Sequence, residues 1–446
     1  MELSNEQQIA YDKYIQGENI FITGPGGAGK SALIKKIYHH ACSRNKNIHV
    51  CALTGCAAVL LNCKAKTLHS WAGIGLGNGS IEQLVKKVRV NKYTKSMWLE
   101  TDILVVDEVS MLSLRLFDTL NTIGKIVRKN ARPFGGIQLI FSGDFYQLPP
   151  VGDKEVPPSM QFCFESDDWY NVFDKASQIQ LIKIFRQTDE VYSTILNQIR
   201  VGRLKRKSND LLVGYVGRKI DENIVIEPTK LFPTKSKVEN LNRMKMDLIE
   251  ENEIVFDRVY PNTSTSGNDN ETTIKMEVNY LARSILCEER LVLKKGAQVM
   301  CIVNIKSDND TEPNLCNGSQ GVVTGFCLLS GCPIVKFNNG IETTMMRHTW
   351  TSEKFTSAYV SQIPLILAWA LTIHKSQGAT LDMAEIDVGS GIFECGQTYV
   401  ALSRVKSLDG LYLTSFDASK IKINKKVREY YESLNEYRDN TGQKCS

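Results

Sequence analysis

Short apolar runs recur along the first part of the chain, with stretches of helical character between them. The runs are Ile20–Ile22, Ile48–Leu53, Ile103–Val106 and Ile137–Phe141. Runs of this length without polar alternation predict strands that are buried on both faces of a sheet. Because the strands alternate with helices, we expect a mostly parallel α/β sheet.

A second set of apolar runs lies late in the chain, at Ile363–Ile373, Ala384–Val388 and Leu411–Thr414. Two separate sets predict two α/β lobes of the nucleoside-triphosphatase type. Glu250–Thr272, between the sets, is largely polar, which predicts an exposed insertion or a mobile loop. Leu291–Trp350 has short alternating runs broken by Gly and Asn, which predicts a small antiparallel barrel inserted into the second lobe.

Composition narrows the class of protein. A chain of 446 residues is long enough for two to four domains. Its net charge of +5 permits a polyanionic partner without requiring one. The twelve cysteines form no C-x-x-C pair, so we expect free thiols in a reducing, intracellular compartment, without a choice between nucleus and cytoplasm. Because Met1–Tyr11 is polar and no apolar run reaches 18 residues, we expect neither a signal peptide nor a membrane span.

The most informative motif follows the first apolar run. The phosphate-loop pattern G-x-x-x-x-G-K-[ST] is formed by Gly24, Pro25, Gly26, Gly27, Ala28, Gly29, Lys30 and Ser31. A strand precedes it and a helical pattern, Ala32–Ile37, follows it, which is the setting that this motif requires. Backbone N–H groups and the helix N-terminus can hold a polyphosphate there. We therefore expect ATP binding, with Lys30 on the β- and γ-phosphates and Ser31 on Mg²⁺.

Other polar residues follow predicted strand ends, where ligands bind in open α/β sheets. Asp107 suits the shell of Mg²⁺, and Glu108 suits a base that orients and deprotonates the attacking water. Gln147 lies in the segment FSGDFYQLPPV, where its amide can contact the γ-phosphate and the water. Arg186 and Arg404 are candidates for arginines delivered from a second lobe to stabilise the charge of the transition state.

Taken together, these motifs resemble those of superfamily 1B DNA helicases of the PIF (petite integration frequency) family, which is related more distantly to RecD-like helicases. Besides the phosphate loop, the resembling segments are Leu3–Gln7, Leu53–Ala58, Lys66–Trp71, Asp107–Met111, Arg132–Gly136, Phe141–Val151, Lys230–Thr234, Leu371–Gly378 and Tyr399–Arg404. They run in family order over nearly the whole chain. One departure is Lys235, which stands where many relatives carry Asn.

The resemblance implies an architecture of two RecA-like lobes, with a small wedge in the first and an SH3-like β-barrel in the second. The expected limits are 1–65 and 96–178 for the first lobe, 66–95 for the wedge, 179–289 and 363–446 for the second lobe with a C-terminal helix, and 290–362 for the barrel. Terminal extensions such as relatives carry are expected to be nearly absent, and with them any targeting function.

The resemblance also assigns ligand-binding residues. Gln7 is expected to read the adenine, and Gly378 to contact the nucleotide. The expected DNA-binding residues are Thr54, Gly55, Thr67, His69, Phe145, Thr234, His374 and Lys375. Polar and basic residues near strand ends suit phosphate contacts. Trp71, Phe145 and Tyr146 are candidates for base stacking, with core packing as the alternative for each.

Two basic stretches have two interpretations each. Lys420–Arg438 predicts an amphipathic helix that either packs on the protein or faces DNA. Arg200–Lys207 is either a solvated face or part of a DNA path.

The sequence therefore predicts a monomeric ATP-dependent helicase whose partners are single-stranded and forked duplex DNA. The resemblance implies 5′-to-3′ movement, roles in DNA replication, repair or recombination, and unwinding of G-quadruplexes or RNA–DNA hybrids. Two rivals stay open: a DNA-stimulated ATPase that translocates without unwinding, and an ATP-switched DNA-binding protein without motor activity. The full hydrolytic set argues against the second rival.

Overall fold

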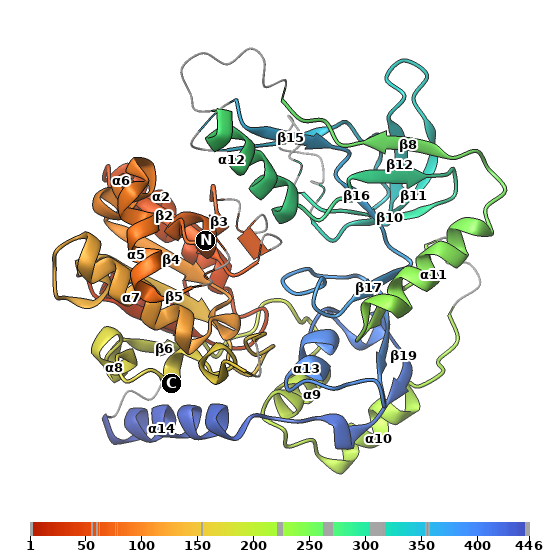
Figure 1. Ribbon diagram of the computed structural model, residues 1–446. Coiled ribbons are helices and arrows are strands. Elements are labelled where there is room, and N and C mark those ends of the chain that lie inside the picture. Colours follow the sequence, from red (N-terminus) through yellow and green to blue (C-terminus); the bar gives the residue numbers. More distant parts are fainter. Residues whose placement is uncertain are drawn as a thin grey trace. The chain divides into compact units, whose positions relative to one another are not determined.

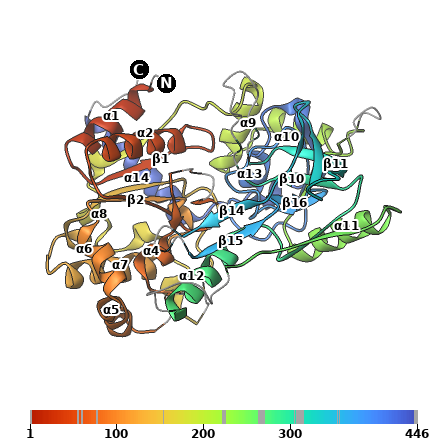
Figure 2. The same ribbon diagram turned by 90° about the horizontal axis from the view of Figure 1, so that it is seen from above.

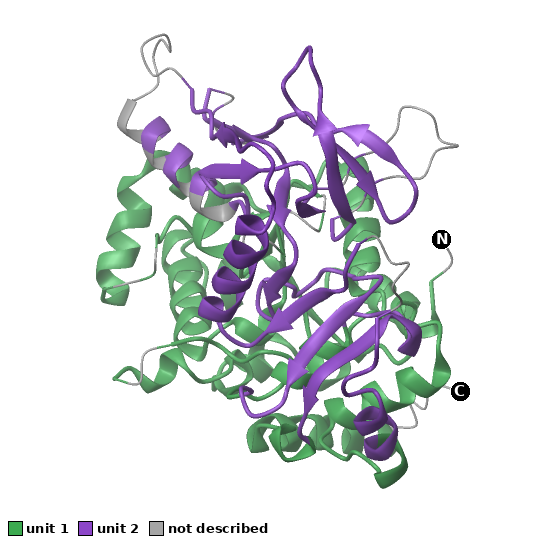
Figure 3. Ribbon diagram, turned by 90° about the vertical axis from the view of Figure 1, so that its right-hand side faces the viewer, with its two compact units in different colours: residues 1–208, 393–403, 418–446 green, residues 209–392, 404–417 purple. Residues whose placement is uncertain are grey.

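The computed structural model describes residues 3–54, 57–58, 61, 63–75, 77, 79–152, 155–220, 226–261, 271–303, 305, 315, 317–352, 355 and 357–441. The chain forms two compact units, which Figure 3 shows in different colours. Unit 1 comprises residues 1–208, 393–403 and 418–446, and unit 2 comprises residues 209–392 and 404–417. The chain therefore passes between the units four times.

Unit 1 is built on a six-stranded sheet with the strand order β3-β2-β4-β5-β1-β6, in which all neighbouring strands are parallel. Its strands are β1 (Ile20–Thr23), β2 (Ile48–Ala52), β3 (Lys66–Thr67), β4 (Ile103–Asp107), β5 (Gln138–Gly143) and β6 (Gln178–Gln180). Each of the first four apolar runs forms one of these strands. The parallel α/β fold expected from those runs is confirmed.

Helices cover both faces of this sheet. They are α1 (Asn5–Ile15), α2 (Lys30–Ser43), α4 (Leu68–Ala72), α5 (Ile81–Val90), α6 (Lys92–Glu100), α7 (Leu114–Val127), α8 (Trp169–Val172) and α14 (Lys425–Thr441). Unit 1 also contains α9 (Glu190–Arg200) and α13 (Gln397–Leu402), which contact each other, and α10 (Arg206–Gly214) contains the boundary with unit 2 in the chain. Figure 2 shows α1 and α2 on one side of the sheet and α5, α6 and α7 on the other.

Alternation along each strand divides the core of unit 1 into two clusters. Ile20 and Ile22 of β1 pack in one cluster with Leu33 of α2, whereas Phe21 packs in the other with Phe117 of α7. Successive side chains of a strand point to opposite faces, so a continuous apolar run supplies both clusters.

The C-terminal helix α14 belongs to unit 1, whereas the sequence analysis placed residues 363–446 in the second lobe. Its Val427, Tyr430, Tyr431 and Leu434 are buried in the same cluster as Phe117. Of the two interpretations of Lys420–Arg438, packing on the protein is therefore confirmed.

Unit 2 contains a parallel sheet and an antiparallel insertion, as the second set of apolar runs and Leu291–Trp350 predicted. The parallel sheet has the order β17-β7-β18-β19, and the antiparallel sheet has the order β13-β12-β11-β10-β16. The parallel strands are β7 (Thr229–Phe232), β17 (Ala370–Thr372), β18 (Ala384–Val388) and β19 (Leu411–Phe416). The antiparallel strands are β10 (Gln298–Cys301), β11 (Gln320–Phe326), β12 (Pro333–Phe337), β13 (Glu342–Thr344) and β16 (Leu365–Leu367).

Two antiparallel strand pairs and two helices complete the described part of unit 2 (Figure 1). They are β8 (Ile254–Asp257) with β9 (Arg290–Leu293), β14 (His348–Thr351) with β15 (Tyr359–Gln362), and the helices α11 (Lys235–Asp247) and α12 (Glu271–Ser284).

Two expectations for unit 2 need correction. The run Ile363–Ile373 is not one strand, because β16 joins the antiparallel sheet and β17 joins the parallel one. The polar stretch Glu250–Thr272 is not wholly a loop. Its residues Ile254–Asp257 form β8, which pairs with β9, while residues 262–270 lie outside the described part of the chain. Polar flanks concealed this short strand.

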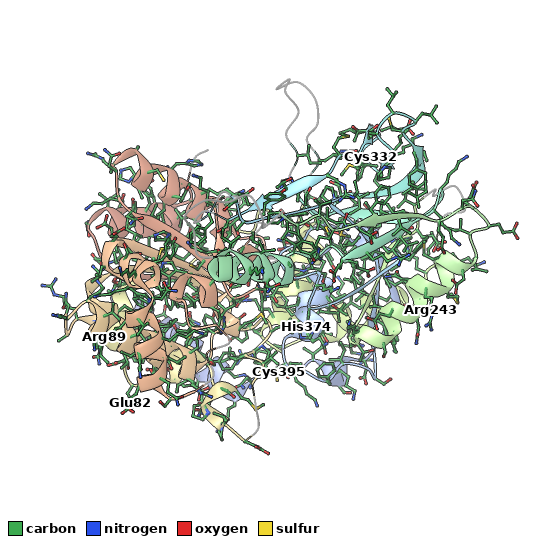
Figure 4. All side chains as sticks on the ribbon, turned by 45° about the horizontal axis from the view of Figure 1, so that its top comes forward. Glu82, Arg89, Arg243, Cys332, His374 and Cys395 are labelled. Atoms are coloured by element: carbon green, nitrogen blue, oxygen red, sulfur yellow. The ribbon has the colours of Figure 1, made fainter. Side chains whose placement is uncertain are left out.

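The expected wedge segment contributes to the core of unit 1. Leu84, Val85 and Val88 of α5 are buried, while Glu82 and Arg89 of α5 lie on its exposed side (Figure 4). Strand separation by this segment stays a prediction. Because deleting it would remove part of the core, a test has to substitute exposed residues of α5 instead.

Among the described residues, we find no helix with the length and apolar character that a membrane crossing requires.

Candidate functional site: a phosphate loop with two carboxylates and an arginine

The phosphate loop joins the end of β1 to the start of α2, and glycine is required at two of its positions. Gly27 and Gly29 have φ values of +85° and +80°. A Cβ at Gly27 would lie 2.4 Å from Cβ of Arg186, and one at Gly29 would lie 2.5 Å from Nε2 of Gln7. The left-handed backbone therefore disfavours a side chain at both positions, and the packing against Arg186 also excludes one at Gly27. The same absence of side chains lets a phosphate approach the loop backbone closely.

Lys30 begins α2 and turns its ammonium group back over the loop. Its Nζ donates to the carbonyl oxygens of Gly24 at 2.7 Å and Pro25 at 3.0 Å. Burial lowers the pKa of the Lys30 ammonium. Nearby carboxylates oppose this effect, and they belong to Asp144, Glu108 and Asp107. The cation expected to meet the phosphates therefore lies among the acidic groups of the site.

Gln7 is buried beneath the loop and has two roles there. Its Oε1 accepts from the Ser4 N–H at 3.0 Å in a capping box that starts α1. Its Nε2 donates to the carbonyl oxygens of Ala28 at 3.3 Å and Gly29 at 3.4 Å. Gln7 thus supports the phosphate loop from behind. Adenine reading by this residue stays a prediction.

Asp107 and Glu108 lie at the carboxyl end of β4. Burial, and then the charge of Glu108, raises the pKa of Asp107 to about 6, although Lys30 acts in the opposite direction. Glu108 has φ 56° and ψ 41°, a left-handed conformation that costs a non-glycine residue on the order of 1–2 kcal/mol. Its charge acts on both Lys30 and Arg186. The strained backbone therefore holds Glu108 within the charged cluster of the site.

The oxygen atoms of Ser31 and Asp107 fit a magnesium ion. Ser31 directly follows Lys30 at the exposed first turn of α2, and the charge of Asp107 acts on Lys30. A hydroxyl and a carboxylate are oxygen ligands of the kind that Mg²⁺ prefers. Burial first, and then the negative charge of Glu108, raises the pKa of Asp107, and a divalent cation bound there would offset both effects.

The raised pKa of Asp107 predicts a pH dependence of nucleotide binding. Only ionised Asp107 can coordinate Mg²⁺, so affinity for a Mg-bound, non-hydrolysable ATP analogue should weaken as the pH falls through about 6. Glu108→Gln removes one cause of the raised pKa and should move this midpoint to lower pH. Fluorescence titrations of both proteins between pH 5 and 8 test this. Since protonation of the nucleotide is common to both, identical midpoints would contradict the assignment.

Gln147 and Asp144 lie together after β5, but Asp144 makes a contact that the sequence did not indicate. Arg200 of α9 donates to Asp144 through Nε and Nη2, each at 2.8 Å, and both side chains are buried. Burial lowers the pKa of Arg200, but the Asp144 carboxylate outweighs this effect and the net shift is upward. Arg200 is therefore not part of a solvated face or a DNA path. No sequence signal distinguished it from the exposed cations that follow it.

Aromatic rings enclose this ion pair. The guanidinium of Arg200 lies 4.6 Å from the ring centre of Tyr146 and 5.4 Å from that of Tyr431, and these two rings stack at 4.6 Å. The Tyr431 hydroxyl also lies 2.6 Å from Oγ1 of Thr23, the last residue before the phosphate loop. Helix α14 is thus bonded directly to the base of the loop.

Arg186 belongs to unit 1, contrary to the expectation that a second lobe supplies it. Its Cβ lies against Gly27, and its Nη1 donates to the carbonyl oxygen of Ser403 at 3.2 Å. Burial lowers its pKa, with Tyr399 and Glu108 acting in the opposite direction. Arg186 is therefore placed beside the phosphate loop within one compact unit.

Arg404 and Gly378 belong to unit 2. The side chain of Arg404 is 1% exposed and its Nη1 donates to the carbonyl oxygens of Ser376 at 3.4 Å and Ala379 at 3.2 Å. The structure brings Arg404 together with the segment that contains Gly378, which has φ +83°. Action of either residue on the nucleotide stays a prediction.

Among the candidate DNA-binding residues of unit 1, His69 lines an open groove. The groove has a volume of about 610 Å³, and Leu53, His69, Ser113, Arg115 and Val151 are among its lining residues. Burial lowers the pKa of His69, so this side chain is a neutral hydrogen-bonding group near pH 7.

The two candidate threonines of unit 1, Thr54 and Thr67, accept hydrogen bonds from nearby backbone N–H groups. Thr54 Oγ1 accepts from Ala57 N–H at 3.2 Å, and Thr67 Oγ1 caps α4 by accepting from Ser70 N–H at 3.4 Å. Gly55 lies outside the described residues. Contact of the threonines with DNA stays a prediction.

The prediction that Phe145 contacts DNA is wrong for this structure. Phe145 is 1% exposed and packs edge-on against Phe164 and Tyr430 in the aromatic part of the core. Trp71 is also buried, with its ring centre 4.5 Å from that of Trp98, and Tyr146 stacks on Tyr431. Core packing is thus confirmed as the role of the three aromatic residues, because a base cannot reach rings that protein atoms cover.

Unit 2 presents the remaining candidates at its parallel sheet. Thr234 is exposed at the N-cap of α11, where its side chain makes no capping bond. His374, labelled in Figure 4, and the exposed Lys375 follow the end of β17. Since β7 and β17 are parallel neighbours, the segments that follow them leave the same edge of the sheet. This placement suits a shared phosphate path, which stays a prediction.

Comparison with known proteins identifies related chains. A family model described as PIF1-like helicase matches residues 2–210, and one described as the 2B domain of DNA helicase Pif1 matches residues 278–326. The ATP-dependent DNA helicase PIF1 of Emericella nidulans is 35% identical over 480 residues, which cover 94% of this chain and 61% of that protein. The chain thus spans about two thirds or less of the length of the curated relatives that it matches.

Two solved structures are similar to this chain over nearly its whole length. The crystal structure of Pif1 helicase from Candida albicans is 36% identical, with a TM-score of 0.76, and covers 97% of this chain and 100% of that one. The crystal structure of Bacteroides Pif1 in complex with ADP-AlF3 and single-stranded DNA is 30% identical, with a TM-score of 0.67, and covers 99% of each chain. Both similarities extend over unit 1 and unit 2.

Proposed function

Because the chain belongs to the PIF1-like helicase family, we propose that it is an ATP-dependent DNA helicase that moves along single-stranded DNA and unwinds duplex DNA. The observation that carries the proposal is the grouping of Lys30, Asp107, Glu108 and Arg186 around one phosphate loop in unit 1. A protein that only binds nucleotide needs the loop but not a base and an arginine beside it.

Each residue of this group has a role that its chemistry supports. The loop N–H groups and Lys30 bind the phosphates. Ser31 and Asp107 hold Mg²⁺, which would neutralise phosphate charge when bound. Glu108 orients and deprotonates the attacking water, and Gln147 contacts both that water and the γ-phosphate. Arg186 stabilises negative charge that develops in the transition state, with Arg404 as a second candidate.

The DNA partner is proposed on two grounds. The Bacteroides relative is described in a complex with single-stranded DNA. In this chain, His69 and Arg115 line the groove of unit 1. Thr234 and Lys375 lie in the segments that follow β7 and β17, at the same edge of the parallel sheet in unit 2. Such contacts go to phosphates, so binding should depend strongly on salt and weakly on base sequence.

We expect unwinding of duplexes that carry a 5′ single-stranded tail and no unwinding of duplexes that carry only a 3′ tail. The reason is the family resemblance, which implies 5′-to-3′ movement. The experiment is a strand-separation assay with ATP on matched substrates that differ only in tail polarity, with Lys30→Ala as the inactive control.

Other outcomes would assign a different function. DNA-stimulated ATPase activity with displacement of a bound protein, but no strand separation, would favour a translocating ATPase. ATP binding without hydrolysis would favour a switch. Efficient unwinding from a 3′ tail would contradict the proposed polarity.

A further inference from the structure

We propose that Tyr399 is a positioning residue for ATP hydrolysis, whose hydroxyl fastens helix α13 to the phosphate loop. This inference rests on the proposed function. Tyr399 has no role in the proposed chemistry, although its hydroxyl contacts the backbone of the phosphate loop directly.

The contact itself is a buried hydrogen bond to the loop. The Gly26 N–H donates to the Tyr399 hydroxyl at 2.8 Å, and Tyr399 is 3% exposed. The hydroxyl also lies within electrostatic reach of Arg186, as does Glu108. Tyr399 therefore ends at the place where the loop, the proposed base and the proposed arginine come together. A side chain there can fix the loop geometry on which the transition state depends.

Helix α13 has other attachments in unit 1, and they bracket this contact. At its start, a Cβ on Gly396 would lie 2.5 Å from the carbonyl oxygens of Tyr146 and Gln147. At its end, the Tyr192 hydroxyl donates to the Leu402 carbonyl oxygen at 2.6 Å. Helices α9 and α13 lie side by side in Figure 1. The helix thus spans from the Gln147 segment, past the phosphate loop, to α9.

The docking of α13 also carries an energetic cost. Within the described residues, Nε2 of Gln397 and Oγ1 of Thr398 are buried and have no hydrogen-bond partner. Unpaired buried polar groups weaken an arrangement. Hydrogen bonds at Tyr399, Tyr192 and Ser403 offset this cost. An element balanced in this way suits a change of position during each ATP cycle.

The chain leaves unit 1 at the end of this helix. Ser403 is the last residue of α13's segment in unit 1, and Arg404 is the first residue of the next segment in unit 2. Only four residues separate Tyr399 from Arg404 in the chain. A change in the conformation of the phosphate loop at Gly26 would therefore be transmitted to Arg404 through Tyr399 and these four residues. Tyr399 would couple the nucleotide to unit 2 even before any contact of Arg404 with phosphate.

The test compares Tyr399→Phe with Tyr192→Phe. Each variant deletes one buried hydroxyl and keeps the aromatic ring. The Tyr399 hydroxyl joins α13 to the phosphate loop, and the Tyr192 hydroxyl joins α9 to α13. Only Tyr399 reaches the phosphate loop. We expect Tyr399→Phe to lower kcat by about tenfold, equivalent to one hydrogen bond in the transition state, and to abolish most of the stimulation by single-stranded DNA. The Kd of Mg-ATP should change by less than about threefold.

The Tyr192→Phe control should match Tyr399→Phe in thermal unfolding but keep kcat and DNA stimulation near those of the wild type. Equal losses of activity in both variants would show that Tyr399 only helps to dock the helix. Unchanged kcat and DNA stimulation in Tyr399→Phe would also overturn the inference. If the wild type itself lacks DNA-stimulated ATPase activity, the proposed function fails first, and the two failures are thereby distinguished.

Discussion

Glu108→Gln is expected to lower ATP turnover by about 10²-fold or more while Mg-nucleotide binding stays near that of the wild type. The amide keeps the shape of the carboxylate but cannot accept the proton of the attacking water. Binding is retained because the loop N–H groups, Lys30 and Asp107 are unchanged. Steady-state ATPase assays and direct titration with a non-hydrolysable analogue measure the two quantities separately.

The backbone of Glu108 provides a sharper control. At φ 56° a glycine is free of the strain that glutamate carries. Glu108→Gly should therefore be inactive and yet at least as resistant to urea as the wild type, with a gain of up to about 1 kcal/mol. A Glu108→Gln protein with turnover near the wild-type value would assign the base elsewhere. A marked loss of stability in Glu108→Gly would mean that the side chain has a structural role.

Arg200→Ala is expected to destabilise unit 1 by about 3–5 kcal/mol. The substitution leaves the buried carboxylate of Asp144 without its two charged hydrogen bonds, and it removes the cation that lies next to the stacked rings of Tyr146 and Tyr431. Urea denaturation followed by near-UV circular dichroism, which reports on the aromatic cluster, measures the effect.

The same region offers a matched control. Arg203 pairs with Glu432 of α14 at 3.7 Å, but its side chain is 73% exposed. Arg203→Ala should change stability by less than about 0.5 kcal/mol, because exposed ion pairs contribute little. The double variant Arg200→Met with Asp144→Asn should recover part of the loss, since it no longer buries an unpaired charge. Similar small effects of Arg200→Ala and Arg203→Ala would contradict the role of the buried pair.

The sequence was sufficient for features that depend on neighbouring residues. The apolar runs of unit 1 predicted β1, β2, β4 and β5, because buried parallel strands need continuous apolar side chains. The phosphate loop was predictable because its glycines, Lys30 and Ser31 act at fixed spacing on one strand–turn–helix. The roles of Glu108 and Gln147 remain predictions, and they too rest on the position of each residue in a short motif after a predicted strand.

Features that depend on distant residues were not predictable in the same way. Asp144 and Arg200 are 56 positions apart, and Asp144 and Tyr431 are 287 apart, so no local spacing links them. Phe145 lies in a motif that resembles a functional segment, but tertiary packing places its ring in the core. Arg186 was assigned to the wrong lobe because composition does not change where the chain crosses between units.

The position of α14 has a consequence for biosynthesis. All six strands of the first sheet precede residue 181, yet the tyrosines that complete its aromatic cluster are residues 430 and 431. At about 5–20 residues per second, the ribosome needs on the order of 12–50 s to add the intervening chain. During that interval the nascent sheet exposes an apolar face, which is a substrate for chaperones. A product that terminates before α14 lacks the Tyr431 hydroxyl, which contacts Thr23 at the base of the phosphate loop. The nucleotide site is therefore complete only in a chain that has been translated through α14.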